Sequence, residues 1–204
     1  MGKKLTYLKN RFFEKRFIIL MIFSLSLSLV ATAVTYLASW YIHETFDIPP
    51  VVKDLIWQKL PYFPLLWLAE VFMLLSLGYM LVWAFKRNKY YLPYAIFLFS
   101  SFHFFRAILI VLTPLGFPHG YNGFFHYGAK SVFMYGAFPS GHLSIPLLTF
   151  LITKSKIVLG LVFLTGLTML ISRSHYSIDL VGTVLVAYPL FEFSEFYLKK
   201  YFIK

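Results

Sequence analysis

The sequence contains no cysteine and few acidic residues. Its 204 residues include 8 Asp and Glu against 19 Lys and Arg, which gives a formal net charge of +11. Without cysteine, a disulfide, a thiolate nucleophile and a cysteine-ligated metal site are all excluded. Charged residues make up only 13% of the chain and hydrophobic residues 59%, a balance that excludes a water-soluble domain. The sequence therefore predicts one integral membrane domain over residues 1–204.

Long apolar segments predict an all-α, polytopic membrane protein with a six-transmembrane-helix bundle over residues 17–198. The first three segments and the last are long enough to cross a hydrocarbon core of about 30 Å at about 1.5 Å per residue. The fourth and fifth would cover only roughly 20 Å each, so we expect their outer ends to stop at about the depth of the lipid phosphates. The six segments are 17–42, 65–85, 90–112, 141–153, 157–171 and 175–197.

Lysine and arginine are distributed unevenly over the predicted loops. The basic segment 1–16, the loops 86–89 and 154–156 and the C-terminus together hold 14 of these residues, and the remainder of the chain holds five. The positive-inside rule then predicts that both termini are cytoplasmic and that the opposite, exoplasmic side carries the candidate site. The same asymmetry accounts for the net charge, so we expect the lipid bilayer and no nucleic acid as a partner.

A polar cluster separates the fifth and sixth apolar segments. His175 and Asp179 have i, i+4 spacing, which places them on one face of a helix that starts near His175. The carboxylate can then accept the Nδ1 proton, which orients the imidazole and leaves Nε2 as the nucleophilic nitrogen. Arg173 contributes a planar, permanently charged donor group that suits phosphate oxygens.

A second polar cluster, Pro-Ser-Gly-His at 139–142, opens the fourth apolar segment. We expect Ser140 to cap the helix and Gly141 to let a ligand approach the backbone. N–H groups at a helix start bind anions, and His142 beside them is placed to act as a general acid. Together the two clusters predict phosphoryl transfer through a phosphohistidine, without a metal or other cofactor.

These clusters also resemble the second and third motifs of the type 2 phosphatidic acid phosphatase superfamily, over roughly residues 99–190. That superfamily comprises membrane lipid phosphate phosphatases and related phosphotransferases, and extends to soluble acid phosphatases and vanadium haloperoxidases. The resemblance implies an enzyme that cleaves a lipid phosphate ester, and the distribution of Lys and Arg predicts that its site faces the exoplasmic leaflet of a cell membrane. It also implies that His175, Asp179 and His142 are the catalytic residues.

The first motif of that superfamily is Lys, six residues, Arg, Pro. The matching stretch here has Arg106, six residues, Thr113 and Pro114. Arg106 therefore replaces the lysine of the motif, and the uncharged Thr113 replaces its arginine. We expect Arg106, together with Arg173, Ser140 and Gly141, to hold the substrate phosphate.

The third motif departs from the common pattern as well. Only Ser174 separates Arg173 from His175, where the common motif has five residues. This compact form is similar to the sphingomyelin synthase and inositol phosphorylceramide synthase branch, which transfers phospho-headgroups between lipids. A headgroup transferase or phospholipase C-like enzyme is therefore the alternative, with diacylglycerol or ceramide as the acceptor lipid of a transferase.

Other polar residues of the apolar segments are candidate accessories. An ionisable residue inside a span indicates a functional site by default, so Glu70 is one candidate. The equal alternative is that Glu70 packs helices together by pairing with Arg106 or a hydroxyl group. His103 and Arg106 have i, i+3 spacing and share a helix face, although a histidine among aromatic residues is more often structural.

The loop 115–138 is rich in glycine and aromatic residues, and we expect it to lie in the headgroup layer over the site. His119 in this loop is another accessory candidate, at the surface or the substrate entrance. A different class of function, a lipid transporter or an inactive lipid-binding membrane protein, stays open because intramembrane Arg, Glu and His also occur along transport pathways.

Overall fold

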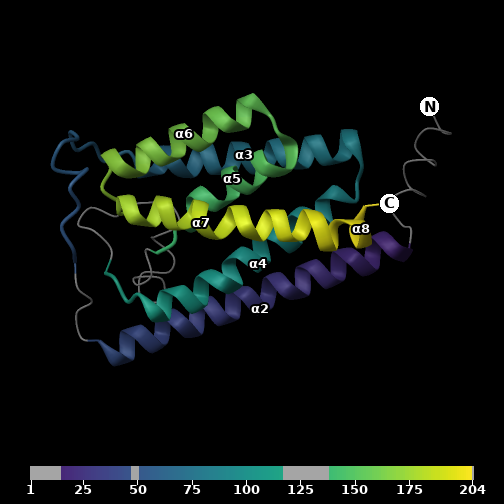
Figure 1. Cartoon of the computed structure of the whole chain (residues 1–204), viewed down its shortest axis with the longest axis horizontal. Helices are drawn as coiled ribbons and strands as arrows, with labels where there is room; N and C mark the ends of the chain where they lie inside the picture. Colours follow the sequence, from purple (N-terminus) through teal and green to yellow (C-terminus); the bar gives the residue numbers. More distant parts are fainter. Residues whose placement is uncertain (1–14, 47–50, 117–137, 204) are drawn as a thin grey trace.

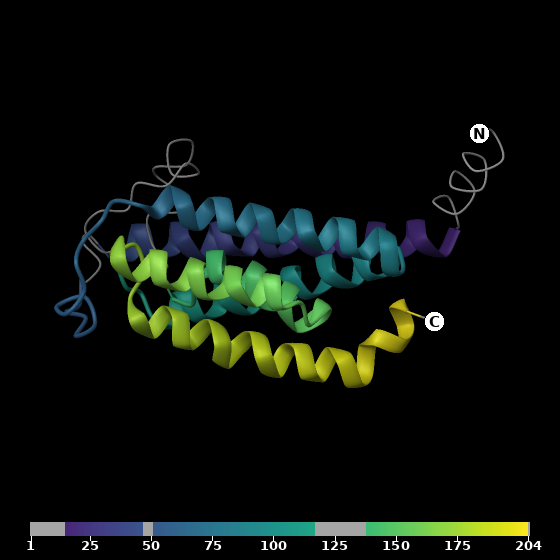
Figure 2. The same cartoon turned by 90° about the horizontal axis from the view of Figure 1, so that it is seen from above.

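The structure is a computed structural model that describes residues 15–46, 51–116 and 138–203 (Figure 1). In these parts of the chain every regular element is a helix, as the sequence predicts. The helices run along a common long direction in both views (Figures 1 and 2). They are α2 (Lys15–Thr45), α3 (Leu66–Arg87), α4 (Tyr91–Leu112), α5 (Gly141–Thr153), α6 (Lys156–Ile171) and α7 (Ser177–Phe193), followed by a π-helical turn, η2 (Ser194–Leu198), and α8 (Lys199–Phe202).

Within the described residues, four stretches of helix are long and apolar enough to cross a membrane: α2, α3, α4 and the run Ser177–Phe202. Helices α5 and α6 have 13 and 16 residues, and at about 1.5 Å per residue neither covers a hydrocarbon core of about 30 Å. Four of the six predicted spans are thus candidates by length and composition. The count of six and the cytoplasmic termini stay predictions.

The outer surface of the bundle is apolar, as a lipid-facing surface would be. Large hydrophobic side chains on different helices are mostly exposed, among them Leu29 at 74%, Phe163 at 70% and Phe196 at 76%. A water-soluble protein rarely exposes so much contiguous apolar surface. The chain is therefore compatible with an integral membrane protein.

Helix α5 is the centre of the bundle, since it contacts α3, α4, α6 and α7. Seven of its 13 residues are buried, and Leu147, Leu148 and Leu151 belong to the largest apolar cluster, which also includes residues of α4 and α7. Because other helices surround it, α5 can be short and can begin with polar residues without exposing them to lipid. Helix α2 packs along α4 on the outside of this arrangement.

Candidate active site

The turn between α6 and α7 carries His175. Helix α7 begins at Ser177 with Tyr176 as its N-cap, two residues after His175, near which the sequence predicts a helix start. The predicted contact nevertheless forms, because His175 Nδ1 lies 3.1 Å from Asp179 Oδ2. Both side chains are almost completely buried.

Asp179 is held in place by the start of its own helix. The Tyr176 backbone N–H donates to Asp179 Oδ2 at 2.8 Å, as in a capping box, in which a carboxylate at the third helical position reaches back to the N-cap residue. The same oxygen atom therefore fixes the helix start and the imidazole. This contact engages Nδ1, and Nε2 is the ring nitrogen on the side away from the carboxylate.

The Pro139–His142 stretch lies directly against this turn. Ser140 has extended backbone angles and its Oγ accepts the Leu143 N–H at 3.3 Å, which confirms the predicted helix cap. The Ser140 N–H in turn donates to the Asp179 carbonyl at 3.3 Å, and Thr183 Oγ1 donates to the Ser140 carbonyl at 3.1 Å. These backbone contacts join the two polar clusters, which lie more than 30 residues apart in sequence.

The two histidine rings face each other across the site. Their centroids are 5.9 Å apart at an interplanar angle of 65°. On its other side His142 meets Glu70 of α3, with Nε2 and Oε1 3.9 Å apart. Glu70 is fully buried, whereas 17% of the His142 side chain is exposed. Each histidine therefore has a buried carboxylate of its own.

Arg106 of α4 reaches the start of α5. Its Nε donates to the Pro139 carbonyl at 2.7 Å. A Cβ atom added at Gly141 would lie 3.2 Å from His103 Cε1 and 3.6 Å from Arg106 Nε, so the missing side chain of Gly141 lets both residues approach the helix N-terminus. The guanidinium and the first turn of α5 form a cationic, donor-rich corner beside His142, which is the kind of place where anions bind.

Thr113 bonds within its own helix, and Arg173 contacts residues of the segment before α3. Thr113 is the C-cap of α4, and its hydroxyl donates to the Leu109 carbonyl of its own helix at 2.7 Å. Arg173 has a left-handed backbone with φ of 49°. Its guanidinium carbon lies 5.5 Å from the centre of the Tyr62 ring, and Nη2 is 3.5 Å from the Trp57 carbonyl. His119 and the rest of 117–137 lie outside the described residues.

Residues 51–62, which lie between α2 and α3, pack on the His175 turn. Asp54 Oδ2 accepts the N–H of Ser177, the first residue of α7, at 2.5 Å. The Trp57 ring stacks on the Tyr176 ring with centroids 4.9 Å apart. Burial raises the pKa of Asp54, but backbone N–H groups of Ser177, Ile56 and Trp57 outweigh it and leave the pKa lowered. The segment therefore braces the residues on either side of His175.

No local signal in the sequence reveals this brace, because Asp54 and Ser177 are 123 residues apart. In the described part of the chain, no three His, Asp or Glu side chains cluster as ligands of a metal ion would.

No protein-family model matches the chain, and a search of curated proteins finds no match either. The family resemblance therefore stays a prediction from the motifs.

Proposed function

We propose that the chain is an integral membrane lipid phosphatase or phosphotransferase that works through a phosphohistidine on His175. The observation that carries this proposal is the pair of facing histidines, 5.9 Å apart, each beside its own buried carboxylate. One oriented nucleophile and one separate acid–base group are what a two-step phosphoryl transfer requires.

In the first step His175 Nε2 attacks phosphorus and forms the N–P bond, while the P–O bond to the leaving group breaks. His142 gives its proton to the departing oxygen. The imidazolium formed at His175 keeps its Nδ1 proton and donates it in a hydrogen bond to Asp179. The negative charge of Asp179 offsets the new positive charge on the ring. In the second step His142 takes a proton from water or an acceptor hydroxyl, whose oxygen attacks phosphorus as the N–P bond breaks.

Arg106 and the first turn of α5 stabilise the negative charge that spreads over the phosphoryl oxygens. Preorganised donors of this kind act most strongly where water is excluded. Gly141 supports the arrangement because its lack of a side chain keeps Arg106 close to the helix N-terminus. Arg173 has a different part in this proposal: it lies by Trp57 and Tyr62 and ties the catalytic turn to residues 51–62.

Headgroup transfer is the second candidate, and Thr113 favours it. The hydroxyl of Thr113 bonds to its own helix, so α4 offers the substrate one cation, Arg106, instead of two. A charged hydrogen bond is worth about 1.5–3 kcal/mol, or roughly one to two decades in binding. A site with fewer cations therefore favours a singly charged phosphodiester over a doubly charged monoester, with diacylglycerol or ceramide as the acceptor.

The decisive experiment incubates the purified protein with phosphatidate and with phosphodiester lipids, each with and without diacylglycerol or ceramide. Free phosphate as the product supports the phosphatase, and a new phospholipid supports the transferase. A ³²P label trapped on the wild type and absent from His175→Ala tests the phosphohistidine. The matched control is His43→Ala, an exposed histidine at the end of α2. Lipid binding without any turnover would overturn the proposal in favour of a lipid-binding protein or transporter.

The proposal also includes orientation in a cell membrane with both termini cytoplasmic and the histidines at the exoplasmic side. It is supported by the distribution of Lys and Arg, since the positive-inside rule places basic loops in the cytoplasm. A reporter fused after Lys204 should be active only on the cytoplasmic side, and one inserted in 117–137 only outside. The reverse pattern would place the site on the inner leaflet.

A further inference from the structure

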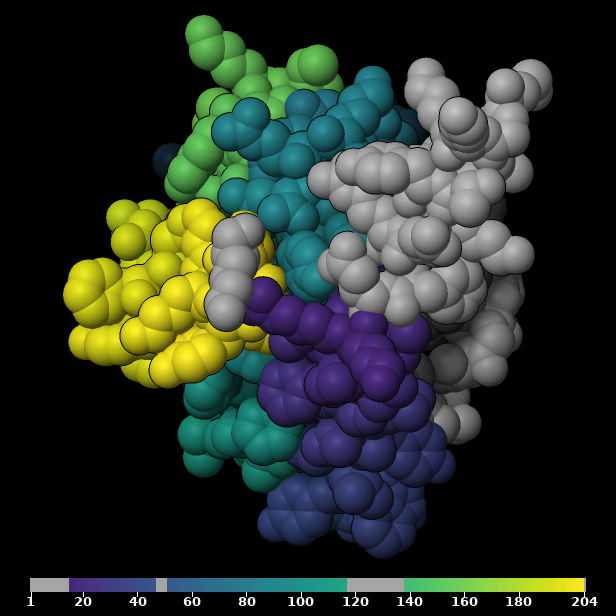
Figure 3. Space-filling view, turned by 90° about the vertical axis from the view of Figure 1, so that its right-hand side faces the viewer, coloured from purple at the N-terminus to yellow at the C-terminus, as the bar shows by residue number. Residues whose placement is uncertain are grey.

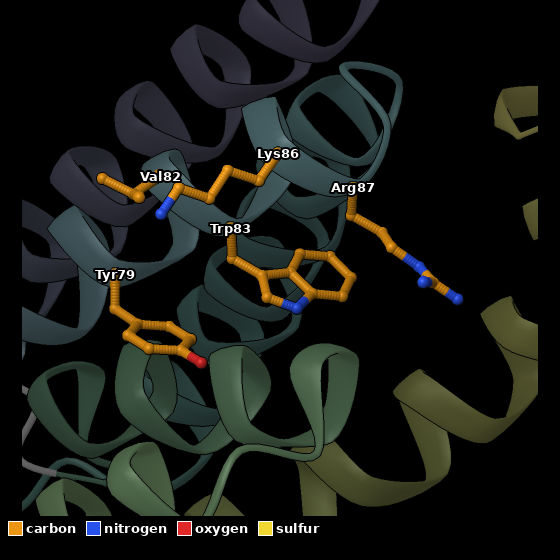
Figure 4. A pocket seen from close by; sticks show the side chains of 5 residues that line it. All are labelled: Tyr79, Val82, Trp83, Lys86 and Arg87. Atoms are coloured by element: carbon orange, nitrogen blue, oxygen red, sulfur yellow. The ribbon is translucent and has the colours of Figure 1, made fainter.

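A second candidate site lies on α3, far along the helix from Glu70. A cavity of about 270 Å³ is lined by Tyr79, Val82, Trp83, Lys86 and Arg87, all in the last three turns of α3. Figure 4 shows the Tyr79 and Trp83 rings on one side of the helix, with the Lys86 side chain folded back toward Val82. The end of the molecule that carries these turns faces the viewer in Figure 3.

The two cations of this cavity have no counter-charge among the described residues. Lys86 and Arg87 are exposed, no ion pair in the described part of the chain includes either residue, and no acidic residue lines the cavity. The nearby C-terminal acid Glu195 is paired with Lys199. Cations at the C-terminal end of a helix are favoured by its dipole, but that effect does not require a cavity between them and two aromatic rings.

Two aromatic rings, those of Tyr79 and Trp83, line the cavity. The Trp83 ring meets the Tyr91 ring edge-on, with centroids 4.7 Å apart and an interplanar angle of 69°, and both Tyr79 and Trp83 are half-buried. Tryptophan and tyrosine are typical of the membrane–water interface at the ends of spans. The residues that line the cavity are thus aromatic or apolar at first and cationic at the end of α3, an apolar helix of 22 residues.

We propose that this cavity binds an anionic phospholipid, with Lys86 contacting its headgroup phosphate, Arg87 adding positive charge at the same end of α3, and an acyl chain lying along Tyr79, Val82 and Trp83. The order of side chains along α3 matches the order of phosphate and hydrocarbon in a bilayer leaflet. Each basic residue near an anionic membrane surface contributes about 1 kcal/mol, so two of them give a preference of roughly tenfold or more over a zwitterionic lipid. The site does not depend on the chemistry at His175.

Trp83 is itself a probe of the site. In a variant that keeps Trp83 and replaces the other three tryptophans by Phe, we expect dibrominated phosphatidylglycerol to quench fluorescence at roughly a tenth of the mole fraction that dibrominated phosphatidylcholine requires. Lys86→Gln combined with Arg87→Gln should bring the two lipids to within about twofold. The control pair Lys156→Gln and Lys200→Gln removes the same charge from exposed positions outside the cavity and should keep the preference.

A second measurement uses the chain with all its tryptophans. Native mass spectrometry from mixed phosphatidylglycerol and phosphatidylcholine micelles should retain phosphatidylglycerol on the wild type and on the control pair, and lose it from the Lys86/Arg87 pair. Circular dichroism checks that each variant is folded. Equal quenching by the two lipids in the parent would overturn the proposal, because the site would then have no preference for an anionic lipid. Equal losses in the two charge pairs would also overturn it and leave only general attraction to an anionic surface.

Discussion

The two histidines of the site differ in exposure and in the distance to the carboxylate beside each of them. His175 is held by Asp179 at 3.1 Å, Asp179 by the Tyr176 N–H, and the helix start by Asp54 from residues 51–62. His142 stands at the start of α5, is partly exposed, and lies 3.9 Å from Glu70. One histidine is clamped on several sides, whereas the other has a carboxylate neighbour at more than hydrogen-bond distance.

This difference fits the two roles in phosphoryl transfer. A nucleophile gains from a fixed direction of attack, because alignment lowers the entropic part of the barrier. An acid–base group must meet a leaving oxygen in one step and water or an acceptor hydroxyl in the next, so access is as important as direction.

The largest effect should come from His175→Ala. Removing the nucleophile leaves no phosphoenzyme, so we expect turnover to fall by at least about 10³-fold for every substrate, whatever its leaving group. His142→Ala should instead slow the first step, release of the leaving group, by about 10²–10⁴-fold for a lipid alkoxide, which needs a proton, and far less for a nitrophenyl ester, which does not. Pre-steady-state release of the leaving group from both substrates measures this, because the second step needs His142 for either substrate. If the two variants lost activity in parallel on both substrates, the assignment of separate roles would be wrong.

Asp179→Asn should have the next largest effect, about 10²–10⁴-fold in kcat, by analogy with other carboxylates that orient a catalytic histidine. The amide still accepts the Tyr176 N–H, but it brings no charge to offset the imidazolium and can turn its NH₂ toward Nδ1. The matched control is Asp54→Asn, the same chemical change at the other carboxylate of the turn. Equal losses in the two variants would mean that Asp179 acts only through the helix start.

Glu70→Gln should lower kcat by about tenfold, a smaller effect because the contact with His142 is longer than a hydrogen bond. Because Glu70 acts through His142, the loss should be larger for a lipid substrate, whose leaving oxygen needs a proton, than for a nitrophenyl ester. The control is Glu192→Gln, an exposed carboxylate on α7. Equal losses on the two substrates would indicate that Glu70 packs helices, which is the alternative that the sequence left open.

Local features of this site were predictable and distant ones were not. The bounds of α5 and the Ser140 cap follow from residues next to one another in sequence, as does the contact between His175 and Asp179. The N-cap of α7 is not predictable in this way, because it is Tyr176, whereas a capping box is normally recognised by Ser or Thr at that position. The neighbours of Glu70 and Asp54 come from other helices, and neither periodicity nor spacing encodes which helices pack together.

The smallest expected effect concerns the brace itself. Asp54→Ala removes the acceptor of the Ser177 N–H at the start of α7, and the loss of such a cap costs about 1 kcal/mol of stability. Since the pKa of Asp54 is lowered in the folded chain, its contribution should be fully present above the unfolded pKa of about 3.9 and disappear as the pH falls through the folded value.

Thermal unfolding of the detergent-solubilised protein checks this sign. The wild type should melt at a higher temperature than Asp54→Ala at neutral pH, and the two curves should converge on acidification below about pH 4. Gln58→Ala, at an exposed position of the same segment, controls for truncation of a side chain there. A difference that stayed constant down to low pH would show that Asp54 acts through its packing and not through its charge. Residues 51–62 would then support the His175 turn by packing alone. The Phe138 ring packs on Gly182 in a comparable way, because a Cβ atom added at Gly182 would clash with that ring.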